Sequence, residues 1–194
     1  RGLYAKPIVL SLIAFLRLLD NYHESDAMYR YLTLPIFNLG QAEIIKITHE
    51  ATKKRWTLCE TAQQARAILR LSDPAQKNLD QALALLDKFI ARAKDEKCSR
   101  IVFDFLNDSN YLKFIDTLPE AKKRQEFSYL GQFYKRVKAF EEINDDKSVK
   151  NFLNPGVQAI YEPGSVFKPI TMAGGIEKGV ITPTSTYYDS GQVT

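Results

Sequence analysis

A serine and a lysine three residues apart form the pair in this chain with the clearest chemical potential. Ser165 and Lys168 lie at a point that the pattern predicts to be the start of a helix. Positions i and i+3 share one helix face, so the Ser165 hydroxyl and the Lys168 amine are expected to meet. A neutral amine can take the serine proton and create a nucleophile for acyl transfer, helped by the positive end of the helix dipole. The alternative is a serine that caps the helix and a lysine in solvent.

Clusters of basic residues point to a different chemistry, the binding of phosphate groups. Lys53, Lys54 and Arg55 are consecutive and are followed by Trp56, an indole that could stack on a base. The alternatives are solvated residues at a helix C-terminus, and a tryptophan that anchors the core beside a helix cap. Two more basic clusters allow the same pair of interpretations: Lys122, Lys123, Arg124 and Lys135, Arg136, Lys138.

The overall composition is compatible with both acyl transfer and phosphate binding. The chain has 194 residues, 45% hydrophobic and 26% charged, and a formal charge of +4, typical of a folded globular protein that tolerates an acidic partner without requiring one. Its two cysteines and two histidines form no metal-ligand pattern, so free thiols and no metal site are expected. The longest apolar run, residues 8–16, is too short to span a bilayer.

The elements that carry the basic clusters are predicted to be helices. Residues 1–150 show apolar residues at helical spacing and no convincing alternating strand, so an all-α region is expected. Expected helices include 7–20, 25–32, 41–54, 57–71, 79–93 and 101–106, and a basic helix from about 119 with apolar positions Phe127, Leu130, Phe133, Val137 and Phe140. Thr57 and Glu60 fit a capping box, and Asp73 precedes a proline as a helix cap.

The amino-acid composition of the chain changes near residue 151. Residues 154–194 contain six of the nine glycines and four of the eight prolines. A short strand at 156–160, a helix at 166–178 and an extended tail are expected there. The predicted organisation is therefore a helical domain, residues 1–150, followed by a short, incomplete α/β segment, residues 151–194.

The second segment resembles the nucleophile region of penicillin-binding proteins, the transpeptidases that crosslink peptidoglycan. The resemblance rests on residues 161–169 (Y-E-P-G-S-V-F-K-P), Met172-Ala173 and residues 179–183 (G-V-I-T-P). It implies Ser165 as the nucleophile, Lys168 as its base partner, and penicillin or a peptidoglycan stem peptide as ligand. The S-x-N and K-T-G elements of that family are absent from these 194 residues, so the implied active site is incomplete.

The helical segment resembles the 2B accessory region of UvrD/Rep/PcrA-type superfamily 1 DNA helicases. The similar stretches, in the same order, are residues 15–21 (F-L-R-L-L-D-N), 29–35 (Y-R-Y-L-T-L-P), 56–60 (W-T-L-C-E), 108–112 (D-S-N-Y-L) and 130–133 (L-G-Q-F). In that family a glycine-containing turn after the proline break contacts the duplex backbone. The corresponding residues are Asn38, Leu39 and Gly40, so the first glycine is replaced and the turn geometry is in question.

The resemblance of the helical segment implies a fragment of an ATP-dependent DNA helicase of DNA unwinding and repair. The fragment would supply a duplex-contacting or regulatory surface, without an ATPase site of its own, and would act in the cytoplasm. No phosphate-binding G-x-x-x-x-G-K-[ST] loop occurs, so ATP and Mg²⁺ are implied only for a complete helicase and no cofactor is expected on this chain. The alternatives are a penicillin-binding protein fragment of the cell envelope and a helical interaction module without activity. Whether the chain is an enzyme stays open, because it lacks a complete active site of either enzyme.

Overall fold

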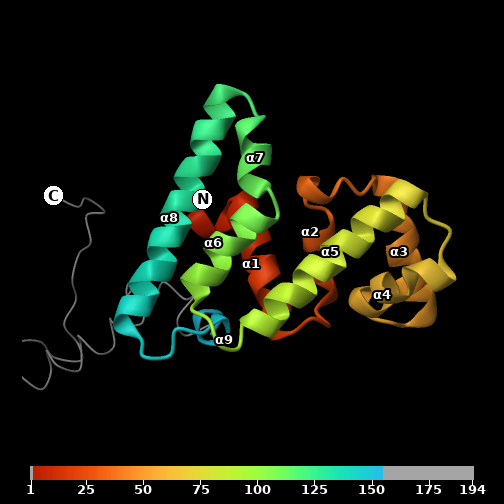
Figure 1. The fold of residues 1–194 in the computed structure, drawn as a ribbon, viewed down its shortest axis with the longest axis horizontal. Coiled ribbons are helices and arrows are strands. Elements are labelled where there is room, and N and C mark those ends of the chain that lie inside the picture. The colour runs from red at the N-terminus through yellow and green to blue at the C-terminus, as the bar shows by residue number, and fades with distance from the viewer. Residues whose placement is uncertain (1, 155–194) are drawn as a thin grey trace, which may run out of the picture. The chain divides into compact units, whose positions relative to one another are not determined.

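Helices make up all the regular structure in the described part of the chain. The computed structural model describes residues 2–154 (Figure 1). Its helices are α1 (Pro7–Asp20), α2 (Ser25–Leu32), α3 (Gln41–Lys54), α4 (Leu58–Ile68), α5 (Asp73–Arg92), α6 (Cys98–Asp108), α7 (Tyr111–Asp116), α8 (Glu120–Ile143) and α9 (Val149–Phe152), with short 3-10 turns η1 (Leu3–Ala5) and η2 (Pro35–Phe37). The prediction of a mainly α protein is confirmed. Ser165, Lys168 and the expected α/β segment lie outside the described residues.

Helix α1 is the element around which the others assemble. It starts with Pro7, whose fixed φ suits the first position of a helix, and most of its side chains are apolar. Its buried residues are Ile8, Val9, Leu12, Ala14, Phe15, Leu16, Leu18 and Leu19. Because these residues occupy nearly its whole circumference, α1 needs neighbours on all sides. It packs against α2, α5, α8 and α9. Among these neighbours, α5 runs from the α6 side of the fold to α3 and α4 (Figure 1).

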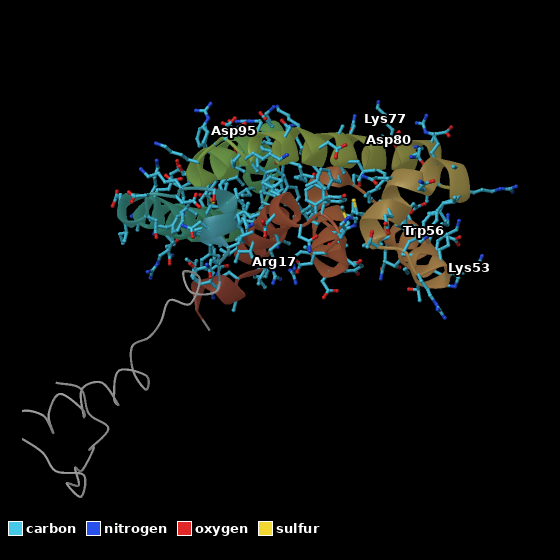
Figure 2. The ribbon with its side chains drawn as sticks, turned by 90° about the horizontal axis from the view of Figure 1, so that it is seen from below. Arg17, Lys53, Trp56, Lys77, Asp80 and Asp95 are labelled. Atoms are coloured by element: carbon cyan, nitrogen blue, oxygen red, sulfur yellow. The ribbon has the colours of Figure 1, made fainter. Side chains whose placement is uncertain are left out.

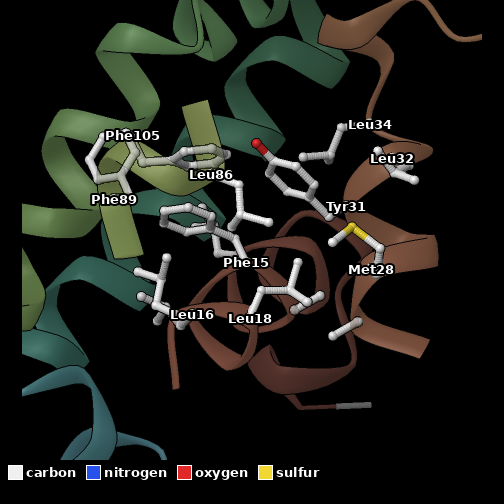
Figure 3. Close-up of a cluster of buried hydrophobic side chains, with 14 of the residues drawn as sticks. Phe15, Leu16, Leu18, Met28, Tyr31, Leu32, Leu34, Leu86, Phe89 and Phe105 are labelled. Atoms are coloured by element: carbon white, nitrogen blue, oxygen red, sulfur yellow. The ribbon is translucent and has the colours of Figure 1, made fainter. Parts of the chain in front are cut away.

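An aromatic cluster lies at the centre of this packing (Figure 3). The Phe15 ring stacks on Phe105 with centroids 3.7 Å apart and meets the edge of Phe89 at 5.5 Å. Tyr31 lies next to Phe15 at 6.2 Å, and its hydroxyl donates a hydrogen bond of 2.8 Å to the carbonyl oxygen of Ala82. The cluster therefore joins α1, α2, α5 and α6, and it leaves its one polar atom satisfied.

Local sequence signals set most helix boundaries. The capping box is present: the Thr57 hydroxyl accepts from the Glu60 amide, and the Glu60 carboxylate accepts from the Thr57 amide. Helix α4 ends at Ile68, three residues before the predicted end, and the cap of α5 is Ser72 rather than the expected Asp73. Helix α7 was not predicted. It has only six residues, too few to show a clear periodic pattern.

A buried carboxylate supplies a cap that no local signal indicates. Glu141 in α8 is 6% exposed and accepts hydrogen bonds from the Ser99 amide, at 2.7 Å, and from the Ser99 hydroxyl, at 2.8 Å. Ser99 lies in the first turn of α6, whose own N-cap residue Lys97 provides no side-chain acceptor. The Glu141 carboxylate therefore caps α6 from another helix, where the positive end of the α6 dipole favours its charge.

Candidate nucleic-acid interface

The predicted contact turn precedes α3 and adopts its bend without a glycine at the first position. Asn38 has φ 46° and ψ 40°, the left-handed conformation that asparagine tolerates better than most residues. Its carbonyl oxygen accepts a hydrogen bond of 3.2 Å from the Asn78 side chain of α5. Leu39 packs partly against the core. Asn38 thus keeps the turn geometry although it replaces the first glycine of the turn. It adopts the left-handed conformation, which glycine would also adopt.

Gly40 is the N-cap residue of α3, and an acidic side chain lies against it. A Cβ atom added at Gly40 would come within 2.7 Å of Oε2 of Glu43, in the first turn of the helix. The free amides at a helix N-terminus attract anions, but here a carboxylate already lies close to them. A phosphate that approaches this turn therefore meets a negative charge as well as the amides.

The basic cluster at the other end of α3 is presented to solvent. Lys53 and Lys54 are the last residues of the helix, and Arg55 follows in the left-handed conformation with φ 55°. The Lys53 side chain is 68% exposed, and both lysines reach Glu50 only loosely, at 3.7 and 3.9 Å. Arg55 is exposed and forms no ion pair with any residue of the described part. Acidic side chains therefore neutralise only part of the positive charge of Lys53, Lys54 and Arg55.

Trp56 extends this surface. Figure 2 labels Trp56 near Lys53, and the indole is 38% exposed. The Lys54 amine lies 4.4 Å from the indole ring centroid in a cation–π contact. The interpretation of Trp56 as a core anchor is therefore wrong. The left-handed Arg55 ends the helix and redirects the chain, so that the ring lies beside the lysine and not under α4.

The two predicted groups of contact residues are not brought together. Asn38 to Gly40 precede α3 and Lys53 to Arg55 end it, so the length of a 14-residue helix separates them. At 1.5 Å per residue that length is about 21 Å. A small ligand cannot bridge them, whereas an extended polyanion such as a duplex is long enough to do so.

Of the other two basic clusters, the one formed by Lys122, Lys123 and Arg124 is more strongly neutralised. Lys123 pairs with Asp116 at 3.7 Å and with Glu120 at 3.5 Å, and Arg124 pairs with Glu120 at 3.0 Å. Lys138 pairs with Glu141 at 3.6 Å. The Lys53–Arg55 cluster and the cluster of Lys135, Arg136 and Lys138 each have one acidic partner for three cations, so both carry more unbalanced charge than Lys122 to Arg124.

Residues 2–154 show no sign of a cysteine nucleophile, a metal site or a membrane-spanning helix. Both cysteines are free and buried, and burial raises the pKa of the Cys59 thiol to about 11 and also raises that of Cys98, so neither is a ready nucleophile at neutral pH. The described residues hold no cluster of three or more metal-ligating side chains. None of their helices is long and apolar enough to cross a membrane.

Comparison with known families finds a match to the end of the chain. Residues 121–194 match the family described as the penicillin binding protein transpeptidase domain. The match covers less than half of the chain and includes Ser165 and Lys168. It begins inside α8, so its first part overlaps helices that pack into the core described above.

Comparison with curated proteins links the helical part to helicases. The chain is 21% identical over 140 residues to one component of the ATP-dependent helicase/nuclease of Bacillus pumilus and 24% identical over 143 residues to the same component from Listeria innocua. It is 23% identical over 112 residues to the ATP-dependent DNA helicase Rep of Buchnera aphidicola. These alignments cover 72, 74 and 58% of the chain but only 11, 11 and 17% of the relatives. The chain is thus similar to UvrD/Rep-type helicases over most of its length and to penicillin-binding transpeptidases over residues 121–194.

Proposed function

We propose that the helical part of this chain is a DNA-contacting and regulatory segment of a UvrD/Rep-type helicase, which acts in the cytoplasm. ATP and Mg²⁺ would be used by the motor of such a helicase, and no residue of this chain is assigned to them. The observation that carries the proposal is the exposed, basic and aromatic end of α3, formed by Lys53, Lys54, Arg55 and Trp56. The similarity to helicase proteins supports the choice of DNA as the polyanion.

The energetics of this surface favour an external anion. Ion pairs between exposed side chains contribute at most about 1 kcal/mol, and the Lys53–Glu50 and Lys54–Glu50 distances are long for such pairs. These lysines can therefore turn to a phosphate at small cost. The Trp56 ring offers a flat apolar face on which an unpaired base at a duplex junction can stack, for about 1–3 kcal/mol.

A matched pair of triple variants tests this proposal. Fluorescence anisotropy would measure binding of the purified chain to a duplex with a single-stranded tail over a series of salt concentrations. Replacing Lys53, Lys54 and Arg55 by alanine should weaken binding and lower the slope of log K against log salt by about 2 to 3, because each lost phosphate contact removes about 0.9. Replacing Lys122, Lys123 and Arg124 by alanine also removes two lysines and one arginine and should have a much smaller effect.

Two results would contradict the proposal. Equal losses from both triple variants would mean that only net charge matters. No binding by the unmodified chain at low salt would leave a helical interaction module as the remaining interpretation.

The second candidate function is acyl transfer at Ser165, which the match of residues 121–194 to the transpeptidase domain favours. In this case the chain would act at the cell envelope on a stem peptide or penicillin. The test is covalent labelling with a fluorescent penicillin, with Ser165→Ala as control. Because the S-x-N and K-T-G elements are absent, we expect no labelling. A band that disappears in Ser165→Ala would show the opposite.

A further inference from the structure

A hollow lies between α6 and α8, on a part of the surface that does not include the basic end of α3. The two helices pack side by side (Figure 1), and the hollow has a volume of about 560 Å³. Pockets for drug-sized ligands measure about 300–1,000 Å³, so the hollow is large enough for a nucleobase with part of its backbone. It shares no residue with α3 or with Trp56.

Two aromatic side chains form the apolar part of the hollow. Phe103 of α6 is 51% exposed, and Tyr134 of α8 is half-buried. A single exposed phenylalanine is common on protein surfaces and needs no explanation. This ring, however, shares the hollow with a second ring, and the Lys138 amine lies 6.0 Å from the centroid of Tyr134. Aromatic faces next to a cation suit an unpaired base whose phosphate lies close by.

Three cations also line the hollow. Lys97 is exposed and forms no ion pair with any residue of the described part. The Arg100 side chain is 65% exposed and pairs with Asp104 through Nε at 2.9 Å, so its terminal nitrogens can reach another acceptor. The Lys138 side chain is 51% exposed, and its acidic partner, Glu141, is 3.6 Å away. That carboxylate already accepts two hydrogen bonds at the start of α6.

Two acids at the hollow reduce its positive charge without cancelling it. Glu96 accepts hydrogen bonds of 2.7 and 2.6 Å from Arg92, so a cation outside the lining balances its charge. Asp95 is exposed and remains as one negative charge against the three cations. Lys135, which follows Tyr134 on α8, is exposed and adds a further positive charge. The hollow therefore attracts an anion, and its rings favour one that carries flat apolar groups.

We propose that this hollow binds single-stranded DNA. Bases stack on Phe103 and Tyr134, and Lys97, Arg100 and Lys138 hold the phosphates. The bases of a duplex are stacked on one another, so their faces cannot reach these rings, whereas the bases of a single strand can. The inference rests on the proposed function in the choice of DNA as the polyanion. It adds a site for the single strand to the duplex-contacting end of α3.

Fluorescence anisotropy with three DNA probes tests this inference. The probes are a labelled oligothymidylate, an abasic oligomer with the same number of phosphates, and a blunt duplex. The full chain should bind the oligothymidylate about fivefold more tightly than the abasic oligomer or better, since this is the lower end of the effect of stacking one base on an aromatic ring. Equal affinities would overturn the inference, because the hollow would then attract any polyanion, an acidic peptide included.

Variants of exposed aromatic residues show where the bases stack. Phe103→Ala should lower the affinity for the oligothymidylate about fivefold and leave those for the abasic oligomer and the blunt duplex unchanged. Tyr29→Ala removes a ring of similar exposure, 49%, from α2, outside the hollow, and should change none of the three. If Trp56→Ala removed the preference for bases and Phe103→Ala kept it, the bases would stack at α3 and the inference would be wrong.

The same probes separate this site from the α3 surface. Weaker duplex binding after replacement of Lys53, Lys54 and Arg55 by alanine supports the proposed function, whatever the two single-strand probes show. If that result came with equal affinities for the oligothymidylate and the abasic oligomer, the proposed function would stand and the site at Phe103 would fall. The comparison of these two oligomers needs no variant, so it decides the matter even if Phe103→Ala fails to fold.

Discussion

Replacing Phe15 by alanine should lower the free energy of unfolding by about 3–5 kcal/mol, the usual range for a buried phenylalanine. The Phe15 side chain is fully buried and touches aromatic rings from three other helices, Tyr31, Phe89 and Phe105. Truncation would leave a cavity that these rings cannot fill, because each is held by its own helix. Urea denaturation followed by circular dichroism measures the loss.

Phe127 offers a matched control for this prediction. It is also a phenylalanine in a helix, but it is 40% exposed on α8. Phe127→Ala should change the free energy of unfolding by about 0.5 kcal/mol or less. A loss below about 1 kcal/mol for Phe15→Ala would contradict the assignment of the aromatic cluster as the centre of the core.

Removing the Glu141 carboxylate should destabilise the protein by about 3 kcal/mol, since each buried donor left without an acceptor costs about 1–3 kcal/mol. Glu141→Ala would leave the buried Ser99 amide and hydroxyl without their acceptors. Alanine has a higher helix propensity than glutamate, so the substitution itself does not weaken α8. The protein is destabilised because the start of α6 loses its cap. Thermal and urea unfolding would both report it.

Two neighbouring substitutions separate this cap from a general effect on α8. Glu142 follows Glu141 but is exposed, so Glu142→Ala should be nearly neutral. Glu141→Gln keeps one acceptor oxygen and should fall between the two. If Glu141→Ala and Glu142→Ala proved equally mild, the hydrogen bonds to Ser99 would not contribute to stability.

Local signals were sufficient to predict most helices. The apolar spacing of residues 8–19 and Pro7 predicted α1 with its observed bounds, and the capping box at Thr57 and Glu60 is present as predicted. Phe127 shows where such signals fail. It continues the apolar pattern of α8 and shares a face with the buried Leu130 and Phe133, yet its own side chain is 40% exposed. Periodicity indicates which residues share a face, and only the packing decides how far along the helix that face is buried.

Partners distant in sequence could not be predicted. Glu141 and Ser99 are 42 residues apart, and Ser25 of α2 accepts a hydrogen bond from the Leu58 amide at the start of α4, 33 residues away. In the candidate interface the basic cluster was predictable by its charge. The exposure of Trp56 was not, because it depends on the left-handed Arg55. Contact of Asn38, Leu39, Gly40 and the basic cluster with DNA stays a prediction.

The central position of α1 has a consequence for the time at which the protein can fold during synthesis. The last of its neighbours among the described helices, α9, begins about 130 residues after α1 ends. Ribosomes add about 5–20 residues per second, so roughly 6–26 seconds pass between the two. During this interval the apolar surface of α1 lacks α9, and for most of it α8 as well. Transiently exposed apolar surface of this kind makes an incomplete chain prone to aggregation before its last helices are made.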